Sequence, residues 1–214
     1  MRHQLQNPQD LERWFSSPRI DTYSHHPDPA GLYAWNFQLA AAYFEVIGHV
    51  EVLLRNFISD RLQAESQFAH WYDDQQRFQL TKIAQANIGK ARNRLVDPET
   101  TGRIVAELSF DFWRFLLAQK HEVTIWRVLR RRGMPHYPQP QARQPFEDCV
   151  ERIYKLRNRI AHHEPLISPI ASAETQRLDQ LSADLDTLAR WIDPDAANWI
   201  ASVSRVTQVR ALRP

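Results

Sequence analysis

Residues 28 to 63 carry the longest uninterrupted helical pattern in the chain. Asp28 and Pro29 are typical of an N-cap and a first helical position. After them, apolar side chains recur at helical spacing on more than one face. At about 1.5 Å per residue the helix would be roughly 50 Å long, and Gly48 is where it could bend or be interrupted. Because several faces are apolar, other helices must cover them, which predicts a bundle built around this segment.

The remaining patterned segments also favour helix over strand. Asn7 and Pro8 cap a first helix that ends before Ser17 and Pro18, and residues 18 to 28 and 134 to 144 are expected loops. Further helices are expected at residues 80–95, 102–118, 121–132, 145–163, 172–192 and 195–206, with Gly133 as the stop of the third. The sequence thus predicts an all-α bundle of about seven to nine helices. One domain would cover residues 1–214, with its core at about 8–205 and a frayed tail at 206–214.

Composition restricts the class of protein. Hydrophobic residues make up 43% and charged residues 24%, which is ordinary for a globular protein. The single cysteine, Cys149, cannot form an intrachain disulfide, which indicates a reducing compartment. No run of 18 apolar residues and no apolar leader is present, so a soluble, cytoplasmic protein without a membrane partner is expected. Walker, dinucleotide and zinc-ligand spacings are missing, and no cofactor or metal is predicted.

A cluster of cationic and polar side chains lies at the expected end of the helix over residues 145–163. Asn158 and His162 are four positions apart and share one helix face, and Arg157 is adjacent to that face. Arg159 and His163 are paired in the same way on the next face. Pro165 should end the helix near these histidines, which places them at an accessible terminus.

This cluster suits chemistry at a phosphodiester. A guanidinium stays protonated and offers a planar fork of donors to phosphate, while an imidazole titrates near neutral pH. Asn158 could hold the His162 ring in one tautomer, and the 2′-hydroxyl of RNA could supply the nucleophile without a metal. A structural alternative stands beside this interpretation. Histidine and arginine at a helix C-terminus complement the helix dipole and bind its free carbonyls, which contributes roughly 0.3–1 kcal/mol.

Three segments together resemble one family. The spacing of Arg157 and His162, with a polar residue after the arginine, resembles the R-x(4–6)-H motif of the HEPN superfamily. Residues 161 to 166, read as AHHEPL, are similar to the narrower Abi-like (abortive infection) branch. Residues 51 to 56 (EVLLRN) and 108 to 113 (LSFDFW) resemble two other segments of that branch, in the same order. Asp111 departs from the pattern, where a small residue is expected.

The resemblance implies an all-helical HEPN-like domain that is usually dimeric. Many members of the family cut RNA without a metal and act as toxins or phage-defence effectors, whereas others have lost activity. On this basis Arg157 would stabilise the phosphorane charge, His162 would act as acid or base with His163 as its substitute, and Asn158 would orient the imidazole. A homodimer with a composite cleft, products ending in 2′,3′-cyclic phosphate, and an antitoxin or defence-system partner would follow.

Two residues of the long helix are candidate supports for this cluster, together with Arg159. Glu51 and Arg55 are four apart and could form an ion pair on the helix surface. Alternatively, they face Arg157 and His162 and orient them. The sequence leaves both arrangements open.

Basic residues are concentrated before the cluster. Residues 127 to 159 contain nine Lys or Arg and three Asp or Glu, a net charge of +6, so that with +2 overall the remainder carries −4. Such a segment could capture RNA, or it could be a solvated helix face with local ion pairs. The candidate RNA-binding residues are Arg130, Arg131, Arg132, Arg152 and Lys155. Two alternatives to a nuclease remain, which are a non-catalytic RNA- or partner-binding helical dimer and a purely structural or regulatory dimer.

Overall fold

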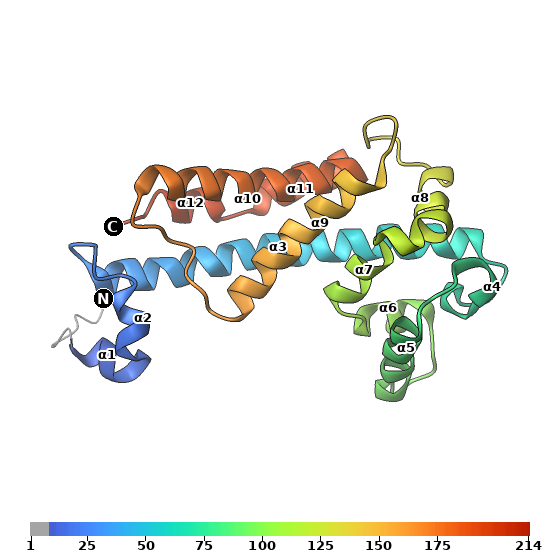
Figure 1. Cartoon of the computed structure of the whole chain (residues 1–214), viewed down its shortest axis with the longest axis horizontal. Helices are drawn as coiled ribbons and strands as arrows, with labels where there is room; N and C mark the ends of the chain where they lie inside the picture. Colours follow the sequence, from blue (N-terminus) through green and yellow to red (C-terminus); the bar gives the residue numbers. More distant parts are fainter. Residues whose placement is uncertain (1–8) are drawn as a thin grey trace.

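The computed structural model describes residues 9–214, and within that range the protein is helical and has no strand, as the sequence predicts. The expected cap at Asn7 and Pro8 lies outside the described residues. A central helix, α3, runs along the molecule and the other helices pack around it (Figure 1). These helices are α1 (Gln9–Phe15), α2 (Ser17–Asp21), α4 (Gln75–Phe78), α5 (Lys82–Arg94), α6 (Thr101–Glu107), α7 (Phe110–Leu116), α8 (Arg127–Arg131), α9 (Arg143–Ala161), α10 (Ala171–Ile192), α11 (Pro194–Val203) and α12 (Val206–Arg210).

Helix α3, Pro29–Glu65, has 37 residues and is roughly 55 Å long. The Asp28 carboxylate accepts a hydrogen bond from the Gly31 amide at 2.8 Å, which caps the helix where the sequence predicts. Gly48 does not interrupt it. Leu32, Leu39 and Leu54 are fully buried, which confirms that this segment is the centre of the bundle.

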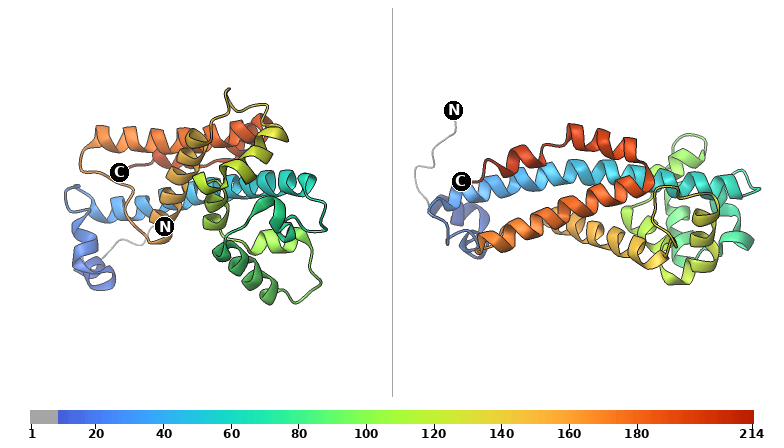
Figure 2. Two further views of the ribbon diagram at one scale, coloured as in Figure 1. Left: turned by 45° about the vertical axis from the view of Figure 1, so that its right-hand side comes forward. Right: turned by 90° about the horizontal axis from the view of Figure 1, so that it is seen from above.

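Two groups of helices and the single helix α9 cover α3. Helices α10, α11 and α12 lie along its N-terminal and middle parts, whereas α4 to α8 gather around its C-terminal end (Figures 1 and 2). Helix α9 crosses α3 obliquely between these groups, so that its C-terminus approaches the N-terminal half of α3. The crossing is what brings the motif of α9 beside the residues of α3.

Helix α3 is also long and apolar enough to cross a membrane by length and composition alone, with a mean hydropathy of 1.3 over its best 18 residues. The core helix of a soluble protein passes the same test. The cytoplasmic location expected from the sequence therefore stays a prediction.

Two expected helices are broken in the structure. Residues 102 to 118 were expected to form one helix, but Leu108 and Ser109 adopt extended backbone angles and separate α6 from α7. The apolar pattern hides this break because residues on both sides of it are buried. The segment at 121–132 is likewise a 3-10 turn, a π-helical turn at Glu122–Trp126 and then α8. Its stop at Gly133, with φ of 97°, is confirmed. These breaks make the number of described helices slightly larger than expected.

The expected loop at residues 18–28 is partly wrong. Ser17–Asp21 forms α2, in which Pro18 occupies the first turn and Ile20 is buried. Helix α9 similarly begins at Arg143 and accommodates Pro145 in its first turn. A proline in these positions starts a helix rather than breaking one, because the first turn has no use for its N–H.

The expectation of a frayed tail is wrong. Val206 and Val209 of α12 are buried, and the indole Nε1 of Trp35 donates a hydrogen bond to the Val209 carbonyl at 2.7 Å. Arg213 forms an ion pair with Glu174 at 2.6 Å. Residues 206 to 213 are therefore held against α3 and α10 by packing, a hydrogen bond and an ion pair.

Replacing Val209 with aspartate should lower the free energy of unfolding by about 2–3 kcal/mol, since the buried valine would be lost and a charge placed against α3. The matched control is Gln208→Asp, which adds the same charge on the exposed side of α12 and should change stability by less than about 0.5 kcal/mol. Urea unfolding measures both. Equal effects would show that the tail does not pack as described.

Candidate functional site

The motif forms the C-terminal end of α9. Phe146, Val150 and Ile153 are buried, which turns the opposite side of the helix toward solvent. His162 caps the helix, and its backbone N–H bonds the Asn158 carbonyl at 2.9 Å. The expected helix end near His163 is confirmed, and His162 is exposed. Its imidazole forms no hydrogen bond within residues 9–214 and is accessible to solvent.

Two backbone hydrogen bonds fix the conformation of the turn after α9. His163 N–H bonds the Ile160 carbonyl and Glu164 N–H bonds the Arg159 carbonyl, each at 2.9 Å, which is the pattern of a Schellman motif. This requires a left-handed residue, and His163 takes that position with φ of 56°, although glycine is preferred there. The chain thus accepts a strained histidine at the motif.

His163 is held by contacts on both sides. Its ring stacks on Phe37 of α3, with centroids 5.9 Å apart, and Arg19 of α2 donates to its carbonyl at 3.0 Å. His163 therefore fastens the turn to α3 and α2. Of the two candidate histidines, His162 is the one whose ring is unengaged by the described residues.

Arg159 also belongs to the turn. Its Nε donates to the Pro165 carbonyl at 3.0 Å and lies 3.7 Å from the Glu164 carboxylate. This contact supports the site by fixing the chain that leaves α9. It also agrees with the structural alternative, because a C-terminal arginine here binds carbonyl and carboxylate groups of its own turn.

Arg157 and Asn158 lie together and are half-buried. The Arg157 guanidinium donates to the Asn158 amide oxygen at 3.5 Å, and within the described chain no hydrogen bond joins Asn158 to the His162 ring. The expected orientation of the imidazole by Asn158 is therefore not observed. Asn158 orients the arginine in this structure instead.

Of the two support residues of α3, Glu51 is the one that interacts electrostatically with Arg157. Burial raises the pKa of Glu51, while the charges of Arg157 and Arg55 oppose that shift. Glu51 and Arg55 form no ion pair in the part of the chain that the structure describes, so the first of the two open arrangements is not found. The Nε of Arg55 is buried and has no hydrogen-bond partner among residues 9–214. Glu51 is thus a half-buried carboxyl that lies near enough to Arg157 and Arg55 for both charges to lower its pKa.

The raised pKa gives Glu51 a measurable effect on stability. The folded protein binds a proton at Glu51 more tightly than the unfolded chain, so this residue's contribution is present below the usual pKa of 4.5 and declines as the pH rises through the folded pKa. Relative to wild type, Glu51→Gln should therefore gain stability as the pH rises above 4.5. Urea unfolding at roughly pH 4 to 8 tests this, and a difference that is independent of pH would contradict it.

The candidate RNA-binding residues do not form one surface. Arg131 and Arg132 of α8 bind the buried Glu65 at the end of α3, and Arg130 is on the same short helix. Glu65 is 28 positions from Phe37, which packs against the motif, so about 42 Å of helix separates the two places. Arg130, Arg131 and Arg132 are therefore far from the motif within one chain, and their role in RNA binding stays a prediction.

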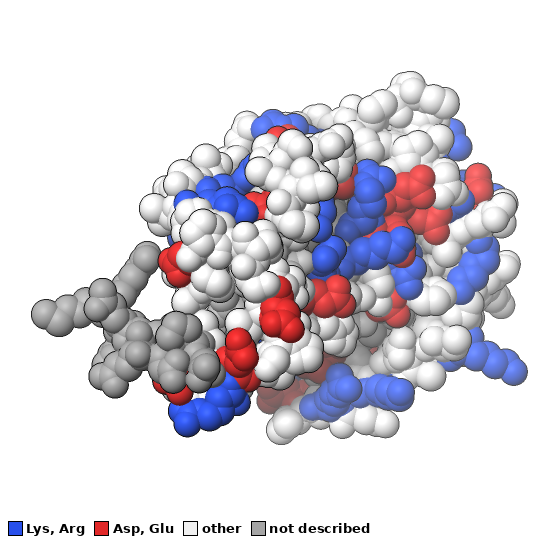
Figure 3. Space-filling view, turned by 60° about the vertical axis from the view of Figure 1, so that its left-hand side comes forward, with Lys and Arg blue, Asp and Glu red and all other residues white. Residues whose placement is uncertain are grey.

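The other two candidates also have partners. Arg152 makes a bidentate ion pair with the buried Asp184 of α10, with both N–O distances 2.8 Å, and so joins α9 to α10. Lys155 is exposed and lies 3.5 Å from Glu151. On the face drawn in Figure 3, basic side chains lie beside acidic ones. Local ion pairing, the second interpretation of the basic segment, therefore describes Arg152 better than RNA binding does.

Asp111, the departure from the family pattern, joins α7 to α9. Its carboxylate accepts from Arg114 at 2.7 Å, and Arg114 also donates to Glu151 of α9 at 2.9 Å. The same guanidinium lies 4.6 Å from the centre of the Tyr154 ring. Arg114 and Tyr154 were not singled out from the sequence, and no local pattern there indicates their pairing.

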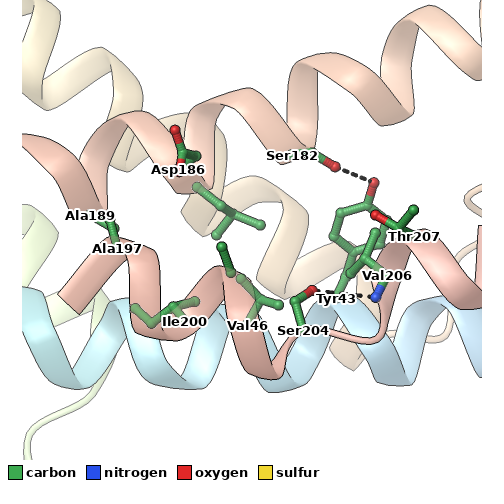
Figure 4. A pocket seen from close by; sticks show the side chains of 12 residues that line it. Tyr43, Val46, Ser182, Asp186, Ala189, Ala197, Ile200, Ser204, Val206 and Thr207 are labelled. Atoms are coloured by element: carbon green, nitrogen blue, oxygen red, sulfur yellow. Dashed lines mark hydrogen bonds between the residues drawn. The ribbon is translucent and has the colours of Figure 1, made fainter. Parts of the chain in front are cut away.

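A separate cavity of about 180 Å³ lies between α3, α10, α11 and α12 (Figure 4). Its polar groups are engaged, since Tyr43 bonds Ser182 at 3.0 Å and Ser204 accepts from the Val206 amide at 3.3 Å. Its remaining lining is mostly apolar. Among residues 9–214, no group of three or more His, Cys, Asp or Glu side chains is arranged to hold a metal ion.

Comparison with known proteins identifies no protein that is similar to this chain. No protein family, no curated protein and no solved structure matches the chain. The resemblance to HEPN proteins therefore stays a prediction that depends on three short segments.

Proposed function

We propose that this protein is a metal-independent endoribonuclease of HEPN type that acts as a toxin or phage-defence effector. The observation that carries the proposal is the cluster at the end of α9, where Arg157 and Asn158 lie side by side and the His162 ring is exposed, with no hydrogen bond to residues 9–214. A half-buried guanidinium and an exposed imidazole at one helix end suit phosphate binding and proton transfer. An antitoxin or another defence protein would be its natural regulator.

In the proposed reaction, His162 takes the proton of an RNA 2′-hydroxyl, and the resulting oxygen attacks the adjacent phosphorus. Arg157 stabilises the negative charge of the pentavalent phosphorane. The bond to the 5′-oxygen then breaks and that oxygen takes a proton. The products are a 2′,3′-cyclic phosphate and a 5′-hydroxyl. In a two-fold dimer, the equivalent histidine of the second copy would supply the second proton transfer.

An apolar surface beside the motif supports a homodimer. Phe37, Phe44 and Val52 are 36%, 47% and 41% exposed and follow one another at helical spacing on α3. Phe37, Phe44 and Ala161 border the same hollow, so a second copy seated there would bring two motifs together.

Phe44→Glu should weaken the proposed dimer by more than about tenfold, because a charge would enter an apolar interface. The matched control is Val96→Glu, which changes a fully exposed valine between α5 and α6. Light scattering after gel filtration measures the assembly of both variants. A wild-type monomer with full activity, or equal behaviour of the two variants, would contradict this arrangement.

The direct test of the function is incubation of the purified protein with several RNAs in the presence of EDTA. Cleavage that survives chelation supports the proposal. Intact RNA together with binding that weakens steeply as salt rises would support the alternative, a non-catalytic RNA- or partner-binding dimer. Absence of both binding and cleavage would support the purely structural alternative, which is favoured by the contact of Arg159 with its own turn and the stacking of His163 on Phe37.

A further inference from the structure

A second basic site lies at the opposite end of α3 from the motif. Two adjacent hollows share the side chains of Arg127 and Arg131, and their volumes are about 640 Å³ and 320 Å³. The larger one lies between the end of α3, α4 and the start of α8, which are grouped together in Figure 1. We call these two hollows the arginine crevice.

One buried carboxylate organises the arginines of the crevice. The Glu65 side chain is 3% exposed and contacts Arg77, Arg131 and Arg132. Asp74, also buried, lies 3.3 Å from Arg77 and caps α4 through the Arg77 amide. Two carboxylates cannot neutralise three guanidiniums, so they fix the positions of the arginines and leave one positive charge in excess.

Two further arginines add charge without compensation. Arg127 and Arg130 are exposed, and within residues 9–214 neither side chain has an ion pair or hydrogen bond. With them the crevice holds five arginines against Glu65 and Asp74, a net charge of +3. This excess of positive charge suits phosphate groups, because phosphate oxygens accept hydrogen bonds from the paired N–H donors of a guanidinium.

The larger hollow also carries groups that suit a base. Phe68 lines it with 52% of its surface exposed, although phenylalanine is usually buried. Exposed glutamines, Gln76 and Gln79, line the same hollow. An aromatic face stacks any base, and amide side chains can both donate to and accept from base edges.

From this combination we infer that the arginine crevice binds single-stranded nucleic acid, with phosphates on Arg127, Arg130 and Arg131 and a base on Phe68. The inference deepens the proposed function and rests on it for the identity of the strand as RNA. At about 3.4 Å per stacked nucleotide, the roughly 42 Å to the motif corresponds to about twelve nucleotides. The crevice would then select long unpaired substrates over short ones.

The test measures binding without cleavage. The probe is a fluorescent twelve-nucleotide oligouridylate with 2′-O-methyl groups, which removes the proposed nucleophile, and its anisotropy is titrated at several salt concentrations. Arg127→Gln combined with Arg130→Gln should weaken binding more than tenfold and reduce the salt slope by about 1.4, because two phosphate contacts are lost. The matched control is Lys82→Gln with Lys90→Gln, which removes equal charge from exposed positions of α5. This control should bind as wild type does.

Two further measurements test whether a base stacks on Phe68 and whether the ligand is a strand rather than a free nucleotide. Phe68→Ala should weaken binding about tenfold and Phe68→Tyr should retain it, since stacking needs only an aromatic face. Uridine monophosphate should compete poorly, whereas competition as effective as that of the oligomer would identify a free nucleotide as the ligand and overturn the inference. The inference would also be overturned if the probe did not bind at low salt, or if the double arginine variant bound it as well as the double lysine control does. Binding through the crevice by a protein that cleaves no RNA would refute the nuclease and leave this inference standing.

Discussion

Arg157→Ala and His162→Ala should each lower the rate of RNA cleavage by about two to three orders of magnitude. The arginine would stabilise charge that develops only in the transition state, and the histidine would move the proton, so either loss acts on the chemical step. Because His162 is exposed and its ring has no hydrogen bond to the described residues, its removal should leave the fold intact. Single-turnover cleavage in EDTA measures the effect.

Lys155→Ala is the matched control for these variants. Lys155 is on the same helix and is also cationic, but its side chain is 71% exposed and within residues 9–214 its ion pair is with Glu151 alone. Its loss should change the cleavage rate by less than about threefold, as expected for a screened surface charge. If the control loses as much activity as the two motif variants, the motif has no special role. If His163→Ala alone abolishes activity while keeping the fold, the assignment of His162 is wrong.

Phe146→Ala should lower the free energy of unfolding by about 3–5 kcal/mol. Phe146 of α9 is fully buried among four aromatic rings, with centroid distances of 5.4 Å to Trp126 and Tyr137, 5.9 Å to Trp191 and 6.4 Å to Phe57. These rings come from α3, α10 and the segments before α9. Without the Phe146 ring these contacts are lost, and the N-terminal part of α9, the helix that carries the motif, would no longer be packed against the core.

Chemical denaturation measures this loss, and Phe115→Ala is the control because Phe115 is 39% exposed. Its deletion should cost about 1 kcal/mol or less. A loss below about 1 kcal/mol for Phe146→Ala would contradict the packing described for α9.

The sequence correctly predicted those helix ends that depend only on the residues at the boundary itself. Asp28 with Pro29, Gly133 and Pro165 each set a boundary through a cap, a left-handed residue or a missing N–H, and none of these depends on the rest of the fold. The break at Ser109 and the packing of α12 were missed. In both, buried apolar residues continue the pattern, and contacts with other helices decide the outcome.

The same division applies to the site. Arg157, Asn158 and His162 are close in sequence, so their common helix end was predictable. The pairing of Arg152 with Asp184 spans 32 positions, and the contact of Arg19 with the His163 carbonyl spans 144. Periodicity carries no information about such partners. For this reason the sequence identified the cluster, but it could not show that Arg152, Arg131 and Arg132 form ion pairs with buried carboxylates.

The chemistry of the cleaved ends tests the central claim most directly. A defined RNA is incubated with the protein in EDTA, and the ends of the products are analysed by mass spectrometry beside a matched RNA with one 2′-deoxy nucleotide at the cut site. The account predicts 2′,3′-cyclic phosphate and 5′-hydroxyl ends, and no cut at the 2′-deoxy position. Products with 3′-hydroxyl ends, or cleavage of the 2′-deoxy substrate at the same rate, would contradict it.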